Sequence, residues 1–275
     1  MVLLVTSASG ANGAGYGKLL AFSDDGELLG SFSDDARIVD PRGLGTDGVM
    51  LFLNSGSNRI LALDGAGRVV RESGVIAGLN PGGGNFGRDG RYYVGLRTAR
   101  TIMAFAPTLD GPGDIVLPPS VVPFPRGFAF GEDGTLFLAS GIGPGSEGDN
   151  TILAFSPERS IKPSWNVEDP ELSPLDLAIA PNGNVIVSSE HPFGTPDAVT
   201  TVREYDRADG RLVRVFAPDR GIRFRKPRGL RFGRGNTLYC VAQDEVVAFD
   251  FVNGICLGAV VRLPGLNGQA VIYFG

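Results

Sequence analysis

A short β-strand pattern occurs six times along this chain at nearly regular intervals. Each copy is an apolar run that ends in an aromatic residue or leucine followed by a small or acidic residue, and the copies occupy 18–23, 59–64, 101–106, 151–156, 201–206 and 245–250. The matching positions lie 41 to 50 residues apart: Phe22, Leu63, Phe105, Phe155, Tyr205 and Phe249. A repeat of this length is one supersecondary unit that buries its core only against its neighbours. The chain is therefore expected to be an array of similar units.

Each copy has two strand patterns before it and one after it, so a unit has four strands, called a, b, c and d in chain order. Strand b precedes the recurring strand c, at 1–7, 50–55, 91–96, 135–140, 184–189 and 237–242. Strand a opens with a Pro-X-Gly-like element, at 41–44, 81–87, 125–131, 174–180 and 227–233. Strand d is more variable, at 27–32, 68–72, 114–117, 211–216 and 255–261. Asp-Gly and Asn-Gly pairs between strands, as at 133–134 and 182–183, favour tight hairpin turns.

The two ends of the chain complete one unit between them. The sequence begins with a strand b and ends, at 267–275, with the apolar pattern of a strand a. We therefore predict a single all-β domain over residues 1–275, a six-bladed β-propeller with four antiparallel strands per blade. The C-terminal strand a closes the ring beside the N-terminal strands b, c and d, which removes the free sheet edges that promote aggregation. No segment has sustained helical periodicity, which excludes a two-domain α/β fold.

The repeating unit resembles the NHL repeat. The resemblance is carried by Pro-Arg-Gly-Leu at 41–44, Leu-Phe-Leu at 51–53, Asn-Arg-Ile-Leu-Ala-Leu-Asp at 58–64 and Gly-Arg-Val-Val at 67–70, and it covers essentially the whole chain. Such propellers are similar to the SMP-30/gluconolactonase, strictosidine-synthase-like and streptogramin lyase propellers. The resemblance implies the fold, whereas the function stays open because these relatives include protein-binding, RNA-binding and catalytic members.

Composition narrows the possible partners and location. A net charge of −5 argues against general affinity for nucleic acid or for an anionic membrane surface. The apolar runs are too short to cross a bilayer, and the N-terminal run reads as a strand rather than a signal peptide. We expect a soluble, cytoplasmic monomer, with secretion after removal of a leader as the alternative.

Three arginines occupy equivalent positions at the start of strand a: Arg42, Arg126 and Arg228. The counterparts in the other blades are Gly82, Leu175 and, in the closing blade, roughly Asn267. Repeat equivalence places the three guanidinium groups near one rim of the central channel. They either pair with acidic residues of neighbouring blades or, together with Asn267, bind a small anionic ligand or an anionic protein or peptide partner.

Three b–c connections are long, at 8–17, 140–150 and 189–200, and these should form a binding surface on one face. The third contains the only histidine, His191, directly after Glu190. Histidine is the natural general base near neutral pH, so His191 and Glu190 are the catalytic candidates. The alternative is that His191 only shapes its loop.

A divalent cation is a further possibility at the channel. The resemblance to SMP-30-like lactonases implies a Ca²⁺ or Mg²⁺ held by a Glu, Asn and Asp set drawn from different blades. The candidate ligands are Asp176, Glu190 and Asn85, with Asn54 and Asn267 as further oxygen donors. Asp176 stands where other blades have glycine, which makes it the strongest of these candidates. The three arginines would disfavour a nearby cation.

Other chemistry is constrained by what the sequence lacks. A single histidine excludes a zinc site built from several histidines, and there is no Gly-x-Ser-x-Gly elbow and no phosphate-binding loop. Cys240 and Cys256 fall on strands b and d of one blade. Two strand spacings of about 4.8 Å each exceed the limit of roughly 7 Å for a disulfide, so both thiols should be free.

Two functions remain open from the sequence. The first is a recognition module that binds an anionic small molecule, protein or peptide on the arginine-lined face. The second is an enzyme on the same face, either a metal-dependent lactonase resembling SMP-30 or a lyase resembling streptogramin lyase.

Overall fold

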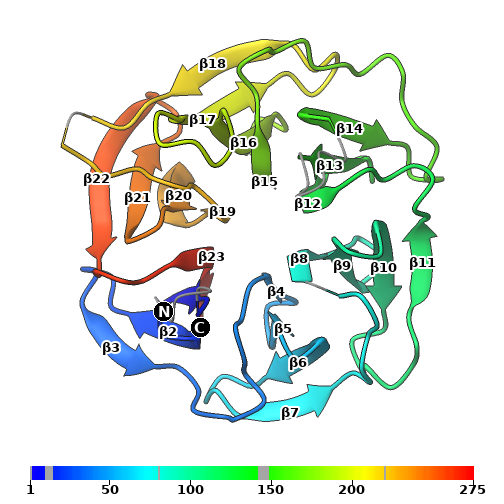
Figure 1. Cartoon of the computed structure of the whole chain (residues 1–275), viewed down its shortest axis with the longest axis vertical. Helices are drawn as coiled ribbons and strands as arrows, with labels where there is room; N and C mark the ends of the chain where they lie inside the picture. The colour runs from blue at the N-terminus through cyan, green and yellow to red at the C-terminus, as the bar shows by residue number, and fades with distance from the viewer. Residues whose placement is uncertain (1, 10–14, 80, 142–148, 220) are drawn as a thin grey trace.

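Six β-sheets are arranged as blades around a central channel in the computed structural model (Figure 1). The structure describes residues 2–9, 15–79, 81–141, 149–219 and 221–275. Among these, the only helical element is a short 3-10 turn, η1, at Arg234–Asn236. The predicted six-bladed all-β propeller is therefore confirmed.

Five blades have four antiparallel strands and one has three. Blade 1 comprises β4 (Leu44–Thr46), β5 (Leu51–Ser55), β6 (Arg59–Leu63) and β7 (Val69–Glu72). Blade 2 comprises β8 (Pro81–Phe86), β9 (Tyr92–Leu96), β10 (Thr101–Phe105) and β11 (Asp114–Leu117). Blade 3 comprises β12 (Pro125–Phe130), β13 (Leu136–Ser140) and β14 (Thr151–Phe155). Blade 4 comprises β15 (Pro174–Ile179), β16 (Val185–His191), β17 (Val199–Tyr205) and β18 (Leu212–Phe216). Blade 5 comprises β19 (Leu230–Phe232), β20 (Thr237–Val241), β21 (Glu245–Asp250) and β22 (Ile255–Arg262).

The sixth blade joins the two ends of the chain, as the sequence predicts. It comprises β23 (Gly268–Phe274), β1 (Val2–Ser7), β2 (Lys18–Phe22) and β3 (Leu28–Ser31). β23 pairs antiparallel with β1 from Val2↔Phe274 onward, and the termini lie together in this blade (Figure 1). The ring is thus closed by backbone hydrogen bonds between the first and last strands, and β1 is paired along both edges, with β23 on one side and β2 on the other.

Blade 3 departs from the four-strand expectation. In place of a fourth strand, the chain after β14 makes one isolated bridge, Phe155↔Ile161, and the Lys162 amide donates to the Ala154 carbonyl at 2.8 Å. Pro157 and Pro163 flank this bridge, and proline has no N–H to donate to a ladder. The segment can therefore make the bridge but cannot extend it into a strand.

The core lies between blades. One cluster of buried residues combines Leu4 of β1 with Leu53 of β5 and Ala270 of β23, and others join each further pair of neighbouring blades. The alternating apolar residues of strands b and c supply these side chains. Each fully buried leucine or phenylalanine contributes about 1.5–3 kcal/mol relative to exposure.

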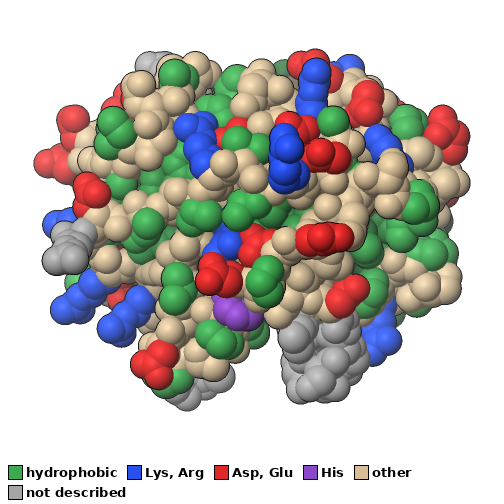
Figure 2. Space-filling model, turned by 90° about the horizontal axis from the view of Figure 1, so that it is seen from above, with side chains coloured by type: hydrophobic (Ala, Val, Ile, Leu, Met, Phe, Trp, Pro, Cys, Tyr) green, Lys and Arg blue, Asp and Glu red, His purple; other side chains and the backbone are tan. Residues whose placement is uncertain are grey.

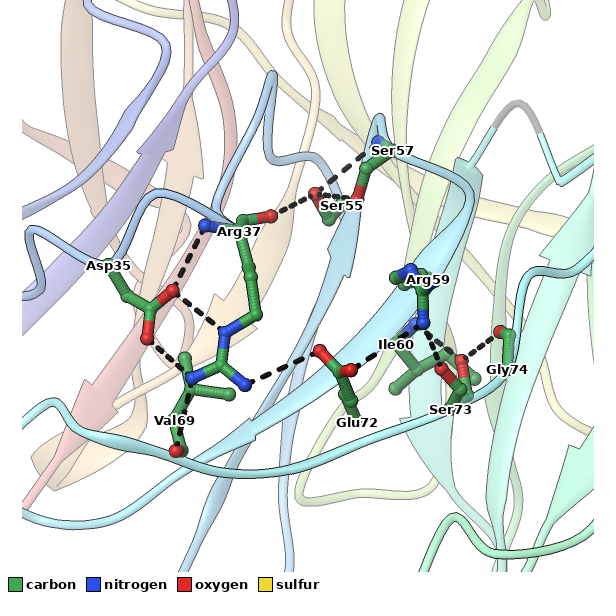
Figure 3. Close-up of polar contacts among 10 residues, drawn as sticks. All are labelled: Asp35, Arg37, Ser55, Ser57, Arg59, Ile60, Val69, Glu72, Ser73 and Gly74. Carbon is green, nitrogen blue, oxygen red and sulfur yellow. Dashed lines mark hydrogen bonds and ion pairs between the residues drawn. The ribbon is translucent and has the colours of Figure 1, made fainter.

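A polar network anchors the linker that enters blade 1 (Figure 3). The Arg37 guanidinium donates to the Asp35 carboxylate at 2.6 Å and to the Glu72 carboxylate at 3.3 Å, and Glu72 also lies 3.6 Å from Arg59. The Ser55 hydroxyl donates to the Arg37 carbonyl at 2.9 Å. The hydrogen bonds from Arg37 lower the pKa of Asp35 to about 2. These contacts fix the segment that leads to Arg42.

The two cysteines are free, as predicted, and both are buried. Cys240 of β20 pairs with Val247 of β21, while Cys256 of β22 pairs with Phe249 of the same β21 strand. Strand β21 therefore separates the two thiols. Burial raises the pKa of Cys240.

Candidate functional site

A cavity of about 480 Å³ opens on the channel face, and residues from all six blades line it. The lining comprises Ala8, Ser9, Arg42, Gly43, Leu44, Gly82, Gly83, Arg97, Arg126, Gly127, Leu175, Asp176, Glu190, Phe193, Gly194, Lys226, Arg228, Gly229, Arg231, Asn267, Gln269 and Ala270. Six of these side chains are basic and two are acidic. By contrast, acidic, basic and apolar side chains are intermixed on the side of the ring (Figure 2). Positive charge is thus concentrated in the cavity of a chain whose net charge is −5.

The three predicted arginines all line the cavity because a bulge recurs at the start of strand a. The Arg42 amide donates to the Asn54 carbonyl, and the Asn54 amide donates to the Gly43 carbonyl. In blade 5 the Arg228 amide donates to the Val241 carbonyl, and the Val241 amide donates to the Gly229 carbonyl. In blade 3 the register of β12 against β13 shifts between Pro125 and Phe128, on either side of Arg126. A bulge places two residues opposite one and redirects a side chain. Each arginine is therefore turned from the sheet toward the channel.

The counterpart of these arginines in the closing blade is Gln269, not Asn267. Val271 pairs with Val5 at the centre of its blade, as Leu44 pairs with Leu53 in blade 1, so the position two residues earlier is Gln269. Both Gln269 and Asn267 line the cavity. The Asn267 amide group donates to the Ala8 carbonyl at 2.8 Å. The predicted ligand-binding Asn267 therefore holds the start of the N-terminal b–c connection at the rim.

Each of the three arginines has a different environment. Arg228 pairs with Glu190 of the neighbouring blade 4, with an Nη1–Oε2 distance of 3.1 Å. Arg42 pairs with Asp40 of its own linker, also at 3.1 Å. The Arg126 guanidinium lies 4.2 Å from the centroid of the Phe193 ring. An ion pair with an acidic residue of a neighbouring blade, which was one of the two expectations for these arginines, is thus formed by Arg228, whereas Arg42 pairs within its own linker.

A fourth arginine, Arg97, joins this group and was missed from the sequence. It follows strand β9, where the other blades carry Ala8, Gly56, Gly141, Glu190 and Gln243. Burial, together with the positive charges of Arg42, Arg126 and Arg228, lowers the pKa of Arg97 to about 9. Burial and the charge of Arg228 lower the pKa of Arg126 to about 10. These shifts show that the guanidinium groups are close enough to repel one another. A comparison of the residue after strand b in each blade would have identified both charged positions, Arg97 and Glu190.

The base of the cavity is occupied by an ion pair between Arg231 and Asp176. The Arg231 guanidinium lies 3.1 Å from the Asp176 carboxylate of blade 4. Its other Nη donates at 3.3 Å to the carbonyls of Leu44 in blade 1 and Gly84 in blade 2. One side chain of blade 5 therefore reaches three other blades across the channel. The sequence singled out Asp176 but not Arg231, whose equivalents are Gly45, Asn85, Ala129, Ala178 and Ile272.

Small residues surround this ion pair because the inner strands approach closely there. The equivalents of Asp176 are Gly43, Gly83, Gly127, Gly229 and Ala270. A Cβ atom on Gly127 would lie 2.0 Å from Asp176 Oδ1, and one on Gly229 would lie 2.6 Å from the Ala270 Cα. Burial raises the pKa of Asp176, although Arg231 and the Leu230 amide favour its ionised form. The narrow part of the channel thus has room for one carboxylate, which Asp176 supplies.

The residues present do not fit a divalent cation. The two carboxylates among the candidate ligands already have partners. Asp176 Oδ2 accepts hydrogen bonds from the Leu230 amide and from Arg231, and Glu190 accepts one from Arg228.

Two of the candidate asparagines also have partners. Asn85 does not line the cavity, and its side-chain oxygen accepts a hydrogen bond from the Phe86 amide. The side-chain oxygen of Asn54 accepts one from the Tyr92 hydroxyl. Among the described residues, no group of three or more His, Cys, Asp or Glu is placed to hold a metal. Asp176 Oδ1 is buried and has no hydrogen bond among the residues that the structure describes, but a single such oxygen among arginines is not a cation site.

The two catalytic candidates point to different places. Glu190 lines the cavity and is 3 % exposed, whereas His191 is not among the lining residues. Both belong to β16, where consecutive side chains lie on opposite sides of the strand. The Nδ1 atom of His191 is buried and makes no hydrogen bond within the described part of the chain. Glu190 and His191 therefore do not form one acid–base pair in this cavity.

The long b–c connections contribute unequally to the lining of the cavity. The third supplies Phe193 and Gly194 to the cavity, and the first supplies Ala8 and Ser9. Residues 10–14 of the first and 142–148 of the second lie outside the described residues.

Within the described residues there is no helix with the length and hydrophobicity that crossing a bilayer would require.

Comparisons with known proteins find similarity in fold alone. No family model matches this sequence, and no curated protein matches it. Among solved structures, a chain of a nidogen/laminin complex is similar with a TM-score of 0.74 and 12 % identity, covering 98 % of this chain and 97 % of that one. A gluconolactonase from Xanthomonas campestris is similar with a TM-score of 0.63 and 16 % identity, covering 98 % of this chain and 88 % of that one.

A streptogramin B lyase is similar with a TM-score of 0.63 and 14 % identity, covering 84 % of this chain and 72 % of that one. The chain is a six-bladed β-propeller. Its structural neighbours include gluconolactonase and streptogramin lyase propellers, as the repeat pattern led us to expect. At these identities the likeness extends to the arrangement of the blades and not to the chemistry of the channel.

Proposed function

We propose that this protein binds a small anionic ligand in the channel-face cavity. The observation that carries the proposal is the gathering of Arg42, Arg97, Arg126 and Arg228 at the rim of one cavity of about 480 Å³. A cavity of this volume suits a small molecule. Guanidinium groups bind carboxylate and phosphate groups through two parallel N–H···O bonds, which favours these anions over others.

The electrostatics of the cavity support this proposal. Burial, and after it the positive charge of neighbouring arginines, lowers the pKa of Arg97 and of Arg126, so holding these charged groups together in the cavity costs free energy in the ligand-free protein. An anion between them would remove that cost, and it would gain charge-assisted hydrogen bonds of about 1.5–3 kcal/mol each. Lys226 is exposed at the same rim and adds to the positive potential that would attract the ligand.

Isothermal titration calorimetry with inorganic phosphate and with citrate tests the proposal. We expect saturable binding to the wild-type protein and a loss of affinity of about tenfold or more in Arg126→Gln and in Arg97→Gln. Arg211→Gln is the matched control, because Arg211 is exposed just before the outer strand β18 and does not line the cavity. An affinity that is equal in all of these variants would reject the proposal.

The second candidate is an enzyme that acts on an anionic or lactone substrate in the same cavity. Its support is the fold shared with gluconolactonase and streptogramin lyase propellers, together with the buried Glu190 carboxylate held 3.1 Å from Arg228. Turnover of glucono-lactone and related lactones, lost in Glu190→Gln and kept in Arg211→Gln, would favour this candidate. Binding of phosphate or citrate without turnover of any lactone would favour the binding protein.

A further inference from the structure

An exposed aromatic side chain lies among the basic residues of the cavity. Phe193 follows β16 in the third long connection, lines the cavity and is 39 % exposed. Most phenylalanines of this protein are buried in the clusters between blades, so an exposed ring at the cavity is unusual for this chain. Its surface is available to a molecule that enters the cavity.

The ring lies beside two of the arginines that the proposed function uses. The guanidinium carbon of Arg126 is 4.2 Å from the Phe193 ring centroid, and that of Arg228 is 5.8 Å from it. An anionic group held by these two guanidiniums would therefore lie next to the ring. Whatever the ligand carries beside its anionic group then comes within contact distance of Phe193.

The other apolar residues of the cavity wall are buried. Leu44 of blade 1, Leu175 of blade 4 and Ala270 of blade 6 also line the cavity, but they are 0 %, 6 % and 6 % exposed, so Phe193 is the most exposed apolar side chain of the lining. Glycines at neighbouring positions, such as Gly82 and Gly194, have no side chain to project into the cavity and so leave it open. A ligand that is anionic throughout would leave the Phe193 ring exposed to water, whereas one with an apolar body would cover it.

We propose that the ligand is an anion with an aromatic ring attached to it, and that Phe193 recognises the ring. This inference rests on the proposed function and names the class of ligand within it. The guanidiniums of Arg126 and Arg228 bind the anionic group, and the aromatic ring of the ligand packs against Phe193. Aromatic pairs of this kind contribute about 0.5–1.5 kcal/mol beyond the area that they bury.

Two phosphate esters of equal charge test this inference, phenyl phosphate and methyl phosphate. Calorimetric titration should give a dissociation constant about three- to tenfold lower for phenyl phosphate with the wild-type protein. In Phe193→Ala this ratio should fall to about one, while inorganic phosphate still binds. The ratio of the two esters is the readout because it cancels any general change in affinity for phosphate.

Phe124→Ala is the matched control. Phe124 also lies over the Arg126 guanidinium, at 5.4 Å, but it does not line the cavity. Any change in phosphate affinity caused by its removal applies equally to both esters, so their ratio should stay at the wild-type value. A melting curve by circular dichroism establishes that each variant is folded, and Phe193→Leu serves as a second variant with an apolar but not aromatic side chain.

The outcomes distinguish failure of the aromatic ligand class from failure of the anion binding on which it rests. Equal affinities for the two esters in the wild type, or a preference that survives in both Phe193 variants, would overturn the aromatic ligand class and leave anion binding intact. Failure of phosphate, citrate and both esters to bind would overturn the proposed function itself. Loss of the preference in Phe193→Ala alone, with Phe193→Leu retaining it, would also overturn the aromatic class, in favour of a general apolar contact.

Discussion

The guanidinium of Arg231 and the carboxylate of Asp176 form an ion pair at the base of the channel, with an Nη1–Oδ2 distance of 3.1 Å. Both side chains are largely buried, at 18 % and 11 % exposed. Arg231 also donates to Leu44 and Gly84, so the pair links four blades. A contact of this kind fixes how the inner strands of opposite blades face one another, and with them the walls of the cavity above.

We expect Arg231→Met to lower the free energy of unfolding by about 3–5 kcal/mol, because it leaves the buried Asp176 carboxylate without its partner. The double variant Asp176→Asn with Arg231→Met should recover most of that loss, since no buried charge then remains. Urea unfolding followed by tryptophan fluorescence or circular dichroism measures both. A double variant that is less stable than the single one would show that the pair does not act as a unit.

Gly127→Ala should destabilise the protein by about 1–3 kcal/mol, because a Cβ there would meet Asp176 Oδ1 at 2.0 Å and the Asp176 Cα at 2.5 Å. Gly65→Ala is the control, since no heavy atom lies within 4 Å of the added methyl group. The melting temperatures of the two variants provide the comparison. Equal melting temperatures would mean that the inner strands of blades 3 and 4 move apart at little cost.

The Asp35–Arg37 contact predicts a defined dependence of stability on pH. Hydrogen bonds from Arg37 hold the pKa of Asp35 at about 2, below its value in the unfolded chain. A depressed carboxyl pKa stabilises the fold above the unfolded pKa of about 4, and this contribution disappears as pH falls toward 2. Wild type should therefore exceed Asp35→Asn in stability at pH 7 by under about 1 kcal/mol, since the pair is partly exposed.

The measurement for this pair is the denaturant midpoint of both proteins at several pH values. The difference between wild type and Asp35→Asn should be constant above about pH 5 and should vanish only below the folded pKa of about 2. A difference that grew as the pH fell would contradict the assignment, because it would mean that the protonated carboxyl is the form favoured in the fold.

Both cysteines should react as free thiols, but only slowly in the native protein. Cys240 is 0 % exposed and burial raises its pKa, so little reactive thiolate is available to a reagent. Titration with a thiol-reactive disulfide should count two thiols after unfolding in denaturant without reductant. A count of zero under those conditions would demonstrate a disulfide and contradict the strand order of blade 5.

The sequence predicted most of the fold because every blade repeats the same local pattern. Alternating apolar residues, Asp-Gly turns and the Pro-X-Gly element specify each blade without reference to its neighbours, and the first and last strands identify the closing blade. Blade 3 is the exception. Its missing strand follows from Pro157 and Pro163, two local departures that a pattern shared by the other blades does not predict.

The candidate site was predicted in part. Repeat equivalence places three arginines at one rim of the channel, Arg42, Arg126 and Arg228. The structure shows that a bulge at the start of strand a turns their side chains into the cavity. Arg97 was missed although it stands at a position that two blades use for a charged residue. His191 and Glu190 were both catalytic candidates and are adjacent in sequence, but adjacent residues of a strand face opposite ways, so only Glu190 lines the cavity.

What the sequence by itself determined is the number of blades, their strand order, the closing blade and the arginines at the channel rim, because these depend on patterns within one blade. Only the tertiary structure decided that Gln269 rather than Asn267 is the equivalent of those arginines, and that Asp176 forms an ion pair with Arg231. Strand register and the approach of opposite blades across the channel set these contacts. Both depend on how all six blades pack together, which no single repeat encodes.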